Sequence, residues 1–161
     1  MSKMTIESEV GLALIEGQYT LTSAESLTAG MFVSELASVP GISAVLPGAF
    51  VTYSAAAKHQ LVGVSQELID SHGVVSAEVA YAMAQGARDT LQTDFAISFT
   101  GVAGPDELEG HPAGTVFIGL VGPKQFERTL ECHFKGDRLA VRQASVQAGM
   151  QMILDALRNI A

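Results

Sequence analysis

The order in which β-type and helical patterns follow one another constrains this chain more than any other feature. Helical patterns separate the first three β-type stretches, a polar loop separates the third from the fourth, and the last two follow each other directly. The expected strands are residues 19–22, 49–53, 94–100, 114–121 and 125–135. Strands that alternate with helices form parallel pairs, and consecutive strands form an antiparallel hairpin. We therefore predict an α/β fold in which helices cover a mixed sheet.

The helical patterns have clear start and stop signals. Helices are expected over residues 5–17, 31–39, 55–61, 65–71, 76–91 and 137–160. Pro40 and Gly41 end the second helix, and Asp137 is the expected N-cap of the last. The 49–53 stretch is continuously apolar and β-rich, so we expect a buried strand that delivers Tyr53 to its end.

Length and composition set the class of protein. A chain of 161 residues is long enough for one self-sufficient domain, residues 1–161. Hydrophobic residues make up 48%, yet no apolar run reaches the ~18 residues of a membrane span. The N-terminus turns acidic early and has no apolar signal core, and the single Cys132 fits a reducing compartment. We expect a cytoplasmic protein with no membrane partner.

Charge and histidine spacing argue against two further classes. A net charge of -8 argues against a nucleic-acid partner, which would require a basic stripe. None of the histidines has the i, i+4 spacing of a helical zinc pair, and no second cysteine is present. The four histidines are His59, His72, His111 and His133. We expect neither nucleic acid nor a metal.

Residues 22–30 are a stretch of small polar residues between the first expected strand and the next helix, and Ser26 lies in its middle. The N–H groups of a first helical turn lack partners and lie at the positive end of the helix dipole, so they would stabilise an alkoxide or oxyanion. Ser26 is therefore a candidate nucleophile. A serine that simply caps the helix would fit the same position.

A nucleophilic serine needs a base, and Lys58 is the available one because no histidine occupies a comparable strand end. A lysine acts as a base only when burial or a neighbouring cation lowers its pKa. Tyr53 could relay the proton or orient the amine. A solvated tyrosine and a solvated lysine explain the same spacing, so this alternative stays open.

The loop after the 94–100 strand is a candidate for binding a ligand. Gly101, Ala103 and Gly104 have small or absent side chains, which permit a phosphate or carboxamide oxygen to approach the backbone N–H groups. An ordinary turn has the same composition.

Arg138 and Arg142 lie one turn apart near the start of the last helix. A phosphate there would meet two cations and free N–H groups. A solvated helix face, with Asp137 as a local partner, is the alternative.

Several motifs together resemble a known family. They are Ala-Glu-Ser-Leu-Thr-Ala-Gly at 24–30, Val-Thr-Tyr-Ser at 51–54 with Lys58, Gly-Val-Val-Ser at 73–76, Thr-Gly-Val-Ala-Gly-Pro at 100–105 and Gly-Asp-Arg at 136–138. In this order and spacing they resemble the CinA C-terminal domain family over nearly the whole chain. The resemblance implies a single-domain, three-layer α/β/α sandwich with a mixed sheet.

The enzymatic members of that family are nicotinamide-nucleotide amidohydrolases. The resemblance thus implies deamidation of nicotinamide mononucleotide to nicotinate mononucleotide and ammonia, in pyridine-nucleotide recycling. Ser26 matches the family nucleophile, and Tyr53 and Lys58 match its activating pair. The positions expected to surround the nucleotide are Thr28, Gly30, Thr100, Gly101, Ala103, Gly104, Arg138 and Arg142. No cofactor or metal is implied, whereas a homo-oligomer is, with a dimer favoured.

Two departures from the family pattern support a second hypothesis. Leu27 and Ala29 stand where the serine motif usually has cysteine and glycine, and residues 106–112 are acidic where the family is usually glycine-rich. Carboxylates in that loop would repel a nucleotide phosphate if they faced it. The alternative is a catalytically weak or inactive nucleotide-binding paralogue with the same fold.

Overall fold

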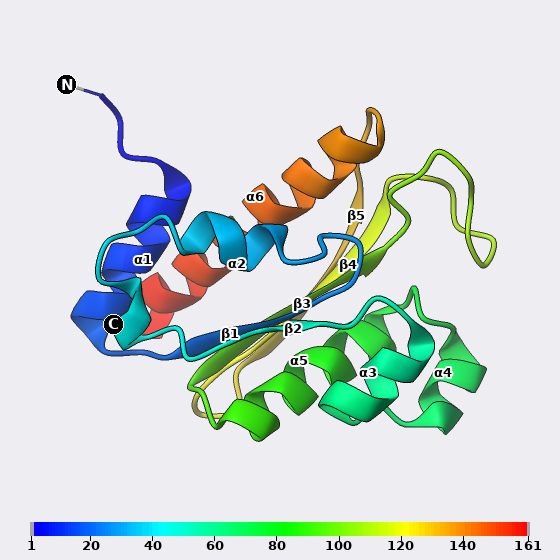
Figure 1. Ribbon diagram of the computed structural model, residues 1–161, viewed down its shortest axis with the longest axis horizontal. Helices are drawn as coiled ribbons and strands as arrows, with labels where there is room; N and C mark the ends of the chain where they lie inside the picture. The colour runs from blue at the N-terminus through cyan, green and yellow to red at the C-terminus, as the bar shows by residue number, and fades with distance from the viewer. Residues whose placement is uncertain (1, 161) are drawn as a thin grey trace.

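A five-stranded mixed sheet forms the centre of the molecule, for which the computed structural model describes residues 2–160. Its strand order is β2-β1-β3-β4-β5 (Figure 1). The strands are β1 (Leu21–Glu25), β2 (Phe50–Val51), β3 (Phe95–Gly101), β4 (Thr115–Val121) and β5 (Glu127–His133). β1 pairs in parallel with β2 and β3, whereas β4 pairs antiparallel with β3 and β5. The predicted mixed sheet and late hairpin are confirmed.

Helices cover both faces of this sheet (Figure 1). One face carries α1 (Ile6–Gly17), α2 (Met31–Leu36) and α6 (Arg138–Ile160). The other carries α3 (Ala55–Val62), α4 (Gln66–His72) and α5 (Ala77–Leu91). A short 3-10 helix, Ile42–Ala44, leads toward β2. The three-layer α/β/α sandwich is confirmed.

The sheet separates two apolar cores because successive side chains of a strand point to opposite faces. Phe95, Ile97 and Phe99 of β3 pack in the core shared with α1, α2 and α6. Ala96, between them, packs with Val79 and Met83 of α5 on the other side. Both faces of β3 and β4 are therefore buried, which accounts for their nearly continuous apolar sequence.

The 49–53 stretch differs from its prediction as a buried strand. β2 contains only Phe50 and Val51, and the Val51 side chain is 49% exposed. β2 is one of the two edge strands and, among residues 2–160, pairs only with β1. β-branched composition indicated a strand correctly but did not distinguish an edge from a centre.

The carboxyl ends of β1, β2 and β3 meet at one edge of the sheet because these strands are parallel. The segments that follow them, which begin at Ser26, Thr52 and Val102, are therefore neighbours in space. Ligands of α/β sheets bind at edges of this kind. No helix among residues 2–160 combines the length and apolarity needed to span a bilayer.

Candidate active site

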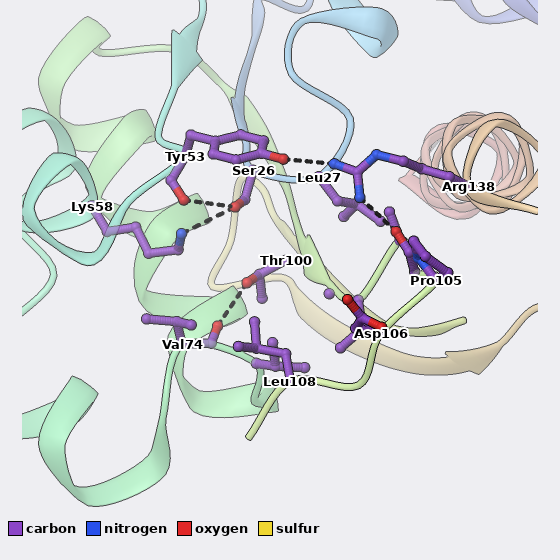
Figure 2. A pocket seen from close by; sticks show the side chains of 15 residues that line it. Ser26, Leu27, Tyr53, Lys58, Val74, Thr100, Pro105, Asp106, Leu108 and Arg138 are labelled. Atoms are coloured by element: carbon purple, nitrogen blue, oxygen red, sulfur yellow. Dashed lines mark hydrogen bonds between the residues drawn. The ribbon is translucent and has the colours of Figure 1, made fainter. Parts of the chain in front are cut away.

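A cavity of about 330 Å³ lies at this edge of the sheet. It is lined by the turn after β1, the segment after β2 with the first turn of α3, the segment between α4 and α5, the end of β3 with the loop after it, and the first residue of α6 (Figure 2). The lining residues used below are Ser26, Leu27, Tyr53, Lys58, Val74, Val75, Thr100, Gly101, Val102, Ala103, Gly104, Asp106, Leu108 and Arg138. Segments far apart in sequence therefore converge on Ser26.

Ser26 and Lys58 are in direct contact in this cavity. The Lys58 Nζ donates a hydrogen bond to Ser26 Oγ at 3.1 Å, and the two side chains point toward each other in Figure 2. The Lys58 side chain is only 1% exposed. Burial lowers the pKa of this amine to about 8, an effect that the negative charge of Glu109 partly opposes. About a tenth of the amine is thus neutral at pH 7, and the neutral fraction rises steeply toward pH 8.

Local structure holds the lysine in this position. Ser54 caps α3 through a hydrogen bond from Ala57 N–H, and Lys58 lies one turn further along the helix. Its amine also donates to the Thr52 carbonyl at 2.8 Å, so the end of β2 fixes the side chain. Apolar burial with only two acceptors favours the neutral amine over the ammonium ion.

α2 ends at Leu36, before the predicted end at residue 39. It begins at Met31, as predicted, and Gly30, at φ +93°, is its N-cap. Ser26 is therefore not a helix cap.

The buried carboxylate of Glu25 accepts the N–H groups of Phe32 at 2.9 Å and Val33 at 3.2 Å. The first turn of α2 is thus occupied by a protein anion. The predicted stabilisation of an oxyanion by this helix is wrong.

Arg142 does not line the cavity, although it lies one turn from Arg138. Its Nε donates to the Leu27 carbonyl at 2.9 Å, and its second nitrogen donates to the Thr28 carbonyl at 3.2 Å. The guanidinium is therefore used to hold the 26–30 turn against α6. The sequence pattern placed both arginines on one helix face but could not show that a backbone turn packs between them.

Tyr53 contributes its backbone to the serine and its hydroxyl to an arginine. Ser26 Oγ donates to the Tyr53 carbonyl at 3.4 Å, a long hydrogen bond. The phenol oxygen instead accepts from Arg138 at 2.9 Å, and the same guanidinium donates to the Gly104 carbonyl at 2.7 Å (Figure 2). The phenol thus lies on the arginine side of the cavity, not between serine and lysine where we expected it.

The remaining predicted binding residues divide into two groups. Thr100, Gly101, Ala103 and Gly104 line the cavity, but the Thr100 hydroxyl is already used on the Val74 carbonyl at 2.6 Å. Thr28 and Gly30 lie outside the lining residues. The Thr28 hydroxyl is buried and has no partner among the described residues.

The acidic loop after β3 presents less negative charge to the cavity than the sequence indicated. Asp106 lines the cavity, whereas the Glu109 carboxylate accepts the N–H groups of Val74 and Val75. Glu107 is exposed and does not line it. No group of three His, Cys, Asp or Glu side chains among residues 2–160 is arranged to hold a metal ion.

Sequence reasoning assigned no role to Glu25 or Thr52. Glu25 adjoins Ser26, and a glutamate directly before a turn and a helix start was the available signal for its helix contact. Thr52 acts through its backbone carbonyl, which any residue type provides, so its role had no signal in the sequence.

These features define a class of protein: an α/β domain that brings a buried lysine against a serine at the carboxyl edge of a mixed sheet. The chain belongs to the CinA C-terminal domain family, whose model matches residues 3–157. A competence-damage inducible protein of Levilactobacillus brevis is 55% identical over 147 residues, which are 91% of this chain and 35% of that protein. One of Limosilactobacillus reuteri is 47% identical over 97% of this chain and 38% of its own length. The chain thus spans little more than a third of these curated relatives.

Solved structures show the same fold. A CinA superfamily protein from Klebsiella pneumoniae has a TM-score of 0.92 and 32% identity, with 96% of each chain covered. A CinA superfamily protein from Escherichia coli has a TM-score of 0.88 and 33% identity, with 96% of this chain and 93% of that one covered. The expected family and fold are confirmed.

Proposed function

We propose that this domain is an amidohydrolase that converts nicotinamide mononucleotide to nicotinate mononucleotide and ammonia, with Ser26 as nucleophile and Lys58 as base. The observation that carries the proposal is the 3.1 Å contact between Lys58 Nζ and Ser26 Oγ, made by a lysine residue that is 1% exposed. A surface lysine stays protonated at neutral pH, whereas a buried one with a pKa of about 8 is available as a base.

In the acylation step, the neutral Lys58 amine takes the hydroxyl proton while Ser26 Oγ forms a bond to the carboxamide carbon. The long hydrogen bond from Ser26 to the Tyr53 carbonyl leaves the hydroxyl proton free to turn toward the amine. The resulting ammonium of Lys58 returns the proton to the departing nitrogen, and ammonia leaves. An ester between Ser26 and the nicotinoyl group remains.

In the second step, water attacks that ester, Lys58 accepts a proton from the water, and Ser26 Oγ leaves and regains a proton. The product is the carboxylic acid, which ionises at neutral pH. The backbone N–H groups of Leu27 and Ala103, two cavity residues, have no acceptor among residues 2–160. We assign them as donors to the oxyanion, in place of the helix start occupied by Glu25.

The choice of substrate rests on the family resemblance and on the two sides of the cavity. Leu27, Val74 and Val102 supply apolar surface near the serine, suited to a pyridine ring. Arg138 supplies a cation at the opposite rim for the phosphate.

One observation favours the alternative of a nucleotide-binding paralogue without activity. Asp106 lines the same cavity as Arg138, and its carboxylate would oppose binding of a phosphate placed beside it. Binding of the mononucleotide without release of ammonia would support this alternative.

Ammonia release from nicotinamide mononucleotide tests the proposal. Ser26→Ala and Lys58→Arg should each lower kcat by about a thousandfold or more, because one removes the nucleophile and the other replaces the base with a group that stays protonated. The exposed positions Ser38 and Lys124 provide matched controls as Ser38→Ala and Lys124→Arg. The wild-type kcat/KM should rise with pH through about 8. Near-normal turnover by Ser26→Ala would exclude the covalent mechanism.

A further inference from the structure

The loop of residues 105–112 forms a small hairpin beside the cavity. Leu108 and His111 exchange both backbone hydrogen bonds, at 3.1 Å and 2.8 Å, and Glu109 and Gly110 between them have positive φ values. The His111 ring packs edge-on against Phe117 of β4. Leu108 itself lines the cavity, and Figure 2 shows it facing the Val74 side.

Glu109, at the tip of this hairpin, binds a different part of the chain. Its Oε2 accepts the Val74 N–H at 3.0 Å, and its Oε1 accepts the Val75 N–H at 2.9 Å. Hydrogen bonds to a charged acceptor are roughly twice as strong as neutral ones. One carboxylate therefore joins the tip of the hairpin to the segment between α4 and α5.

Gly73 makes room for this contact. A Cβ at this residue would lie 2.7 Å from Glu109 Oε1, and the backbone φ of +76° disfavours any other residue type. On the other side of segment 73–75 from Glu109, the Val74 carbonyl accepts a hydrogen bond from the Thr100 hydroxyl. Segment 73–75 is thus fixed by β3 on one side and by Glu109 on the other.

We propose that Glu109 is a positioning residue for substrate binding: it holds the 105–112 hairpin against segment 73–75 and so fixes Leu108 as a wall of the cavity opposite Val74. This inference rests on the proposed function. The Ser26–Lys58 contact comes from β1 and α3 and includes no residue of the hairpin. The Glu109 charge also raises the pKa of Lys58, so the chemical step is compared above pH 8, where the amine is largely neutral with or without that charge. Under that condition, loss of the Glu109 contact should weaken substrate binding and leave the chemical step intact.

The first arm of the test compares Glu109→Ala with Glu107→Ala, which removes the same charge from the same hairpin but no hydrogen bond among the described residues. Amide hydrogen exchange of Val74 and Val75, followed by NMR, should become about tenfold faster or more in Glu109→Ala and stay unchanged in Glu107→Ala. Equal exchange in the two variants would overturn the proposal. This arm needs no activity, so it remains decisive if the amidohydrolase proposal fails.

The second arm measures steady-state kinetics with nicotinamide mononucleotide. At about pH 9, where the Lys58 amine is largely neutral in every variant, Glu109→Ala should raise KM about tenfold with kcat within about twofold of wild type, whereas Glu107→Ala should change neither. Glu109→Gln keeps one acceptor oxygen and should fall between Glu109→Ala and wild type. A fall in kcat at unchanged KM would contradict a positioning role.

Gly73→Ala provides an independent variant because its methyl group would displace the same carboxylate from the other side. It should raise KM in the wild-type background and raise it by less in the Glu109→Ala background, because the carboxylate contact is already lost there and only the strain of an alanine at φ +76° remains. Additive effects in this double-mutant cycle would show that Gly73 and Glu109 act separately and would overturn the proposal. Circular dichroism confirms that each variant is folded.

Discussion

At the scale of single residues, Arg138 and Arg142 lie one turn apart in the same helix but have different surroundings. Arg138 is exposed at the cavity, whereas Arg142 binds the carbonyls of Leu27 and Thr28. The original expectation of two equivalent phosphate ligands therefore separates into two roles.

We predict that Arg138→Ala weakens binding of nicotinamide mononucleotide about ten- to a hundredfold and leaves binding of the phosphate-free riboside nearly unchanged. Only the phosphorylated ligand can form charge-assisted hydrogen bonds with the guanidinium. Arg142→Ala should weaken both ligands equally, because it loosens the turn that carries Ser26. Isothermal titration calorimetry of both ligands against both variants measures the difference. Equal weakening by Arg138→Ala would place the phosphate elsewhere.

The sequence was informative about which residues gather at the site and less informative about which atoms they use. Lys58 and Ser26 were paired from their chemistry, and the structure places them in contact. The Tyr53 phenol was expected near the lysine but lies on Arg138, because its direction depends on the end of β2 and on α6, which are far apart in sequence. Backbone acceptors such as the Thr52 carbonyl leave no trace in residue type.

At the scale of elements, α2 shows how a short helix is fixed beside a functional turn. It has six residues, too few for stability by propensity alone. Its first N–H groups are taken by Glu25, which also accepts the Ser23 hydroxyl at 2.9 Å. The fully buried carboxylate therefore ties the end of β1 to the start of α2.

We predict that Glu25→Ala lowers the free energy of unfolding by about 2–4 kcal/mol, because it leaves a buried hydroxyl and two N–H groups without their charged acceptor. Glu25→Gln keeps one acceptor oxygen and should lose less. Urea denaturation followed by circular dichroism measures both values. A loss as small as that of an exposed control, Glu16→Ala, would mean that water replaces the carboxylate at no cost.

Element types could be predicted from sequence because their patterns are local. The helices over 5–17 and 76–91 have a capping residue and an apolar face, and both formed, with Thr5 and Ser76 as their N-caps. The extent of β2 and the end of α2 could not be predicted, since both depend on contacts with segments elsewhere in the chain. Local patterns predict an element, whereas its ends are set by tertiary contacts.

At the scale of the whole molecule, the distance between the layers depends on two glycines. A Cβ at Gly119 of β4 would lie 2.6 Å from the backbone oxygen of Ala80 in α5. A Cβ at Gly149 of α6 would lie 2.5 Å from the ring of Phe99 in β3. The helix layers therefore approach the sheet most closely where side chains are absent.

Gly119→Ala should destabilise the protein by about 2–3 kcal/mol, because the backbone of α5 cannot move without disturbing its whole layer. Gly149→Ala should cost less, since a single aromatic ring can shift and alanine gains about 1 kcal/mol of helix propensity over glycine. Thermal and urea unfolding of both variants test this order. A larger loss for Gly149→Ala would show that the ring is as immobile as the backbone.

The burial of Lys58 also has a consequence for how the fold responds to pH. Its pKa is about 8 in the folded protein and 10.5 when unperturbed, so the unfolded chain retains a proton that the folded protein has lost between these values. Proton linkage then makes the folded state more stable as pH rises from about 8 to 10.5, by up to about 3 kcal/mol, whereas below pH 8 the full penalty of a buried ammonium is present. Lys58→Met has no amine to titrate. The unfolding free energy of wild type should therefore rise over that range relative to that of Lys58→Met. A constant difference would mean that the amine keeps its proton in the folded protein over this range. Ser26 and the Thr52 carbonyl would then bind an ammonium ion and not a neutral base.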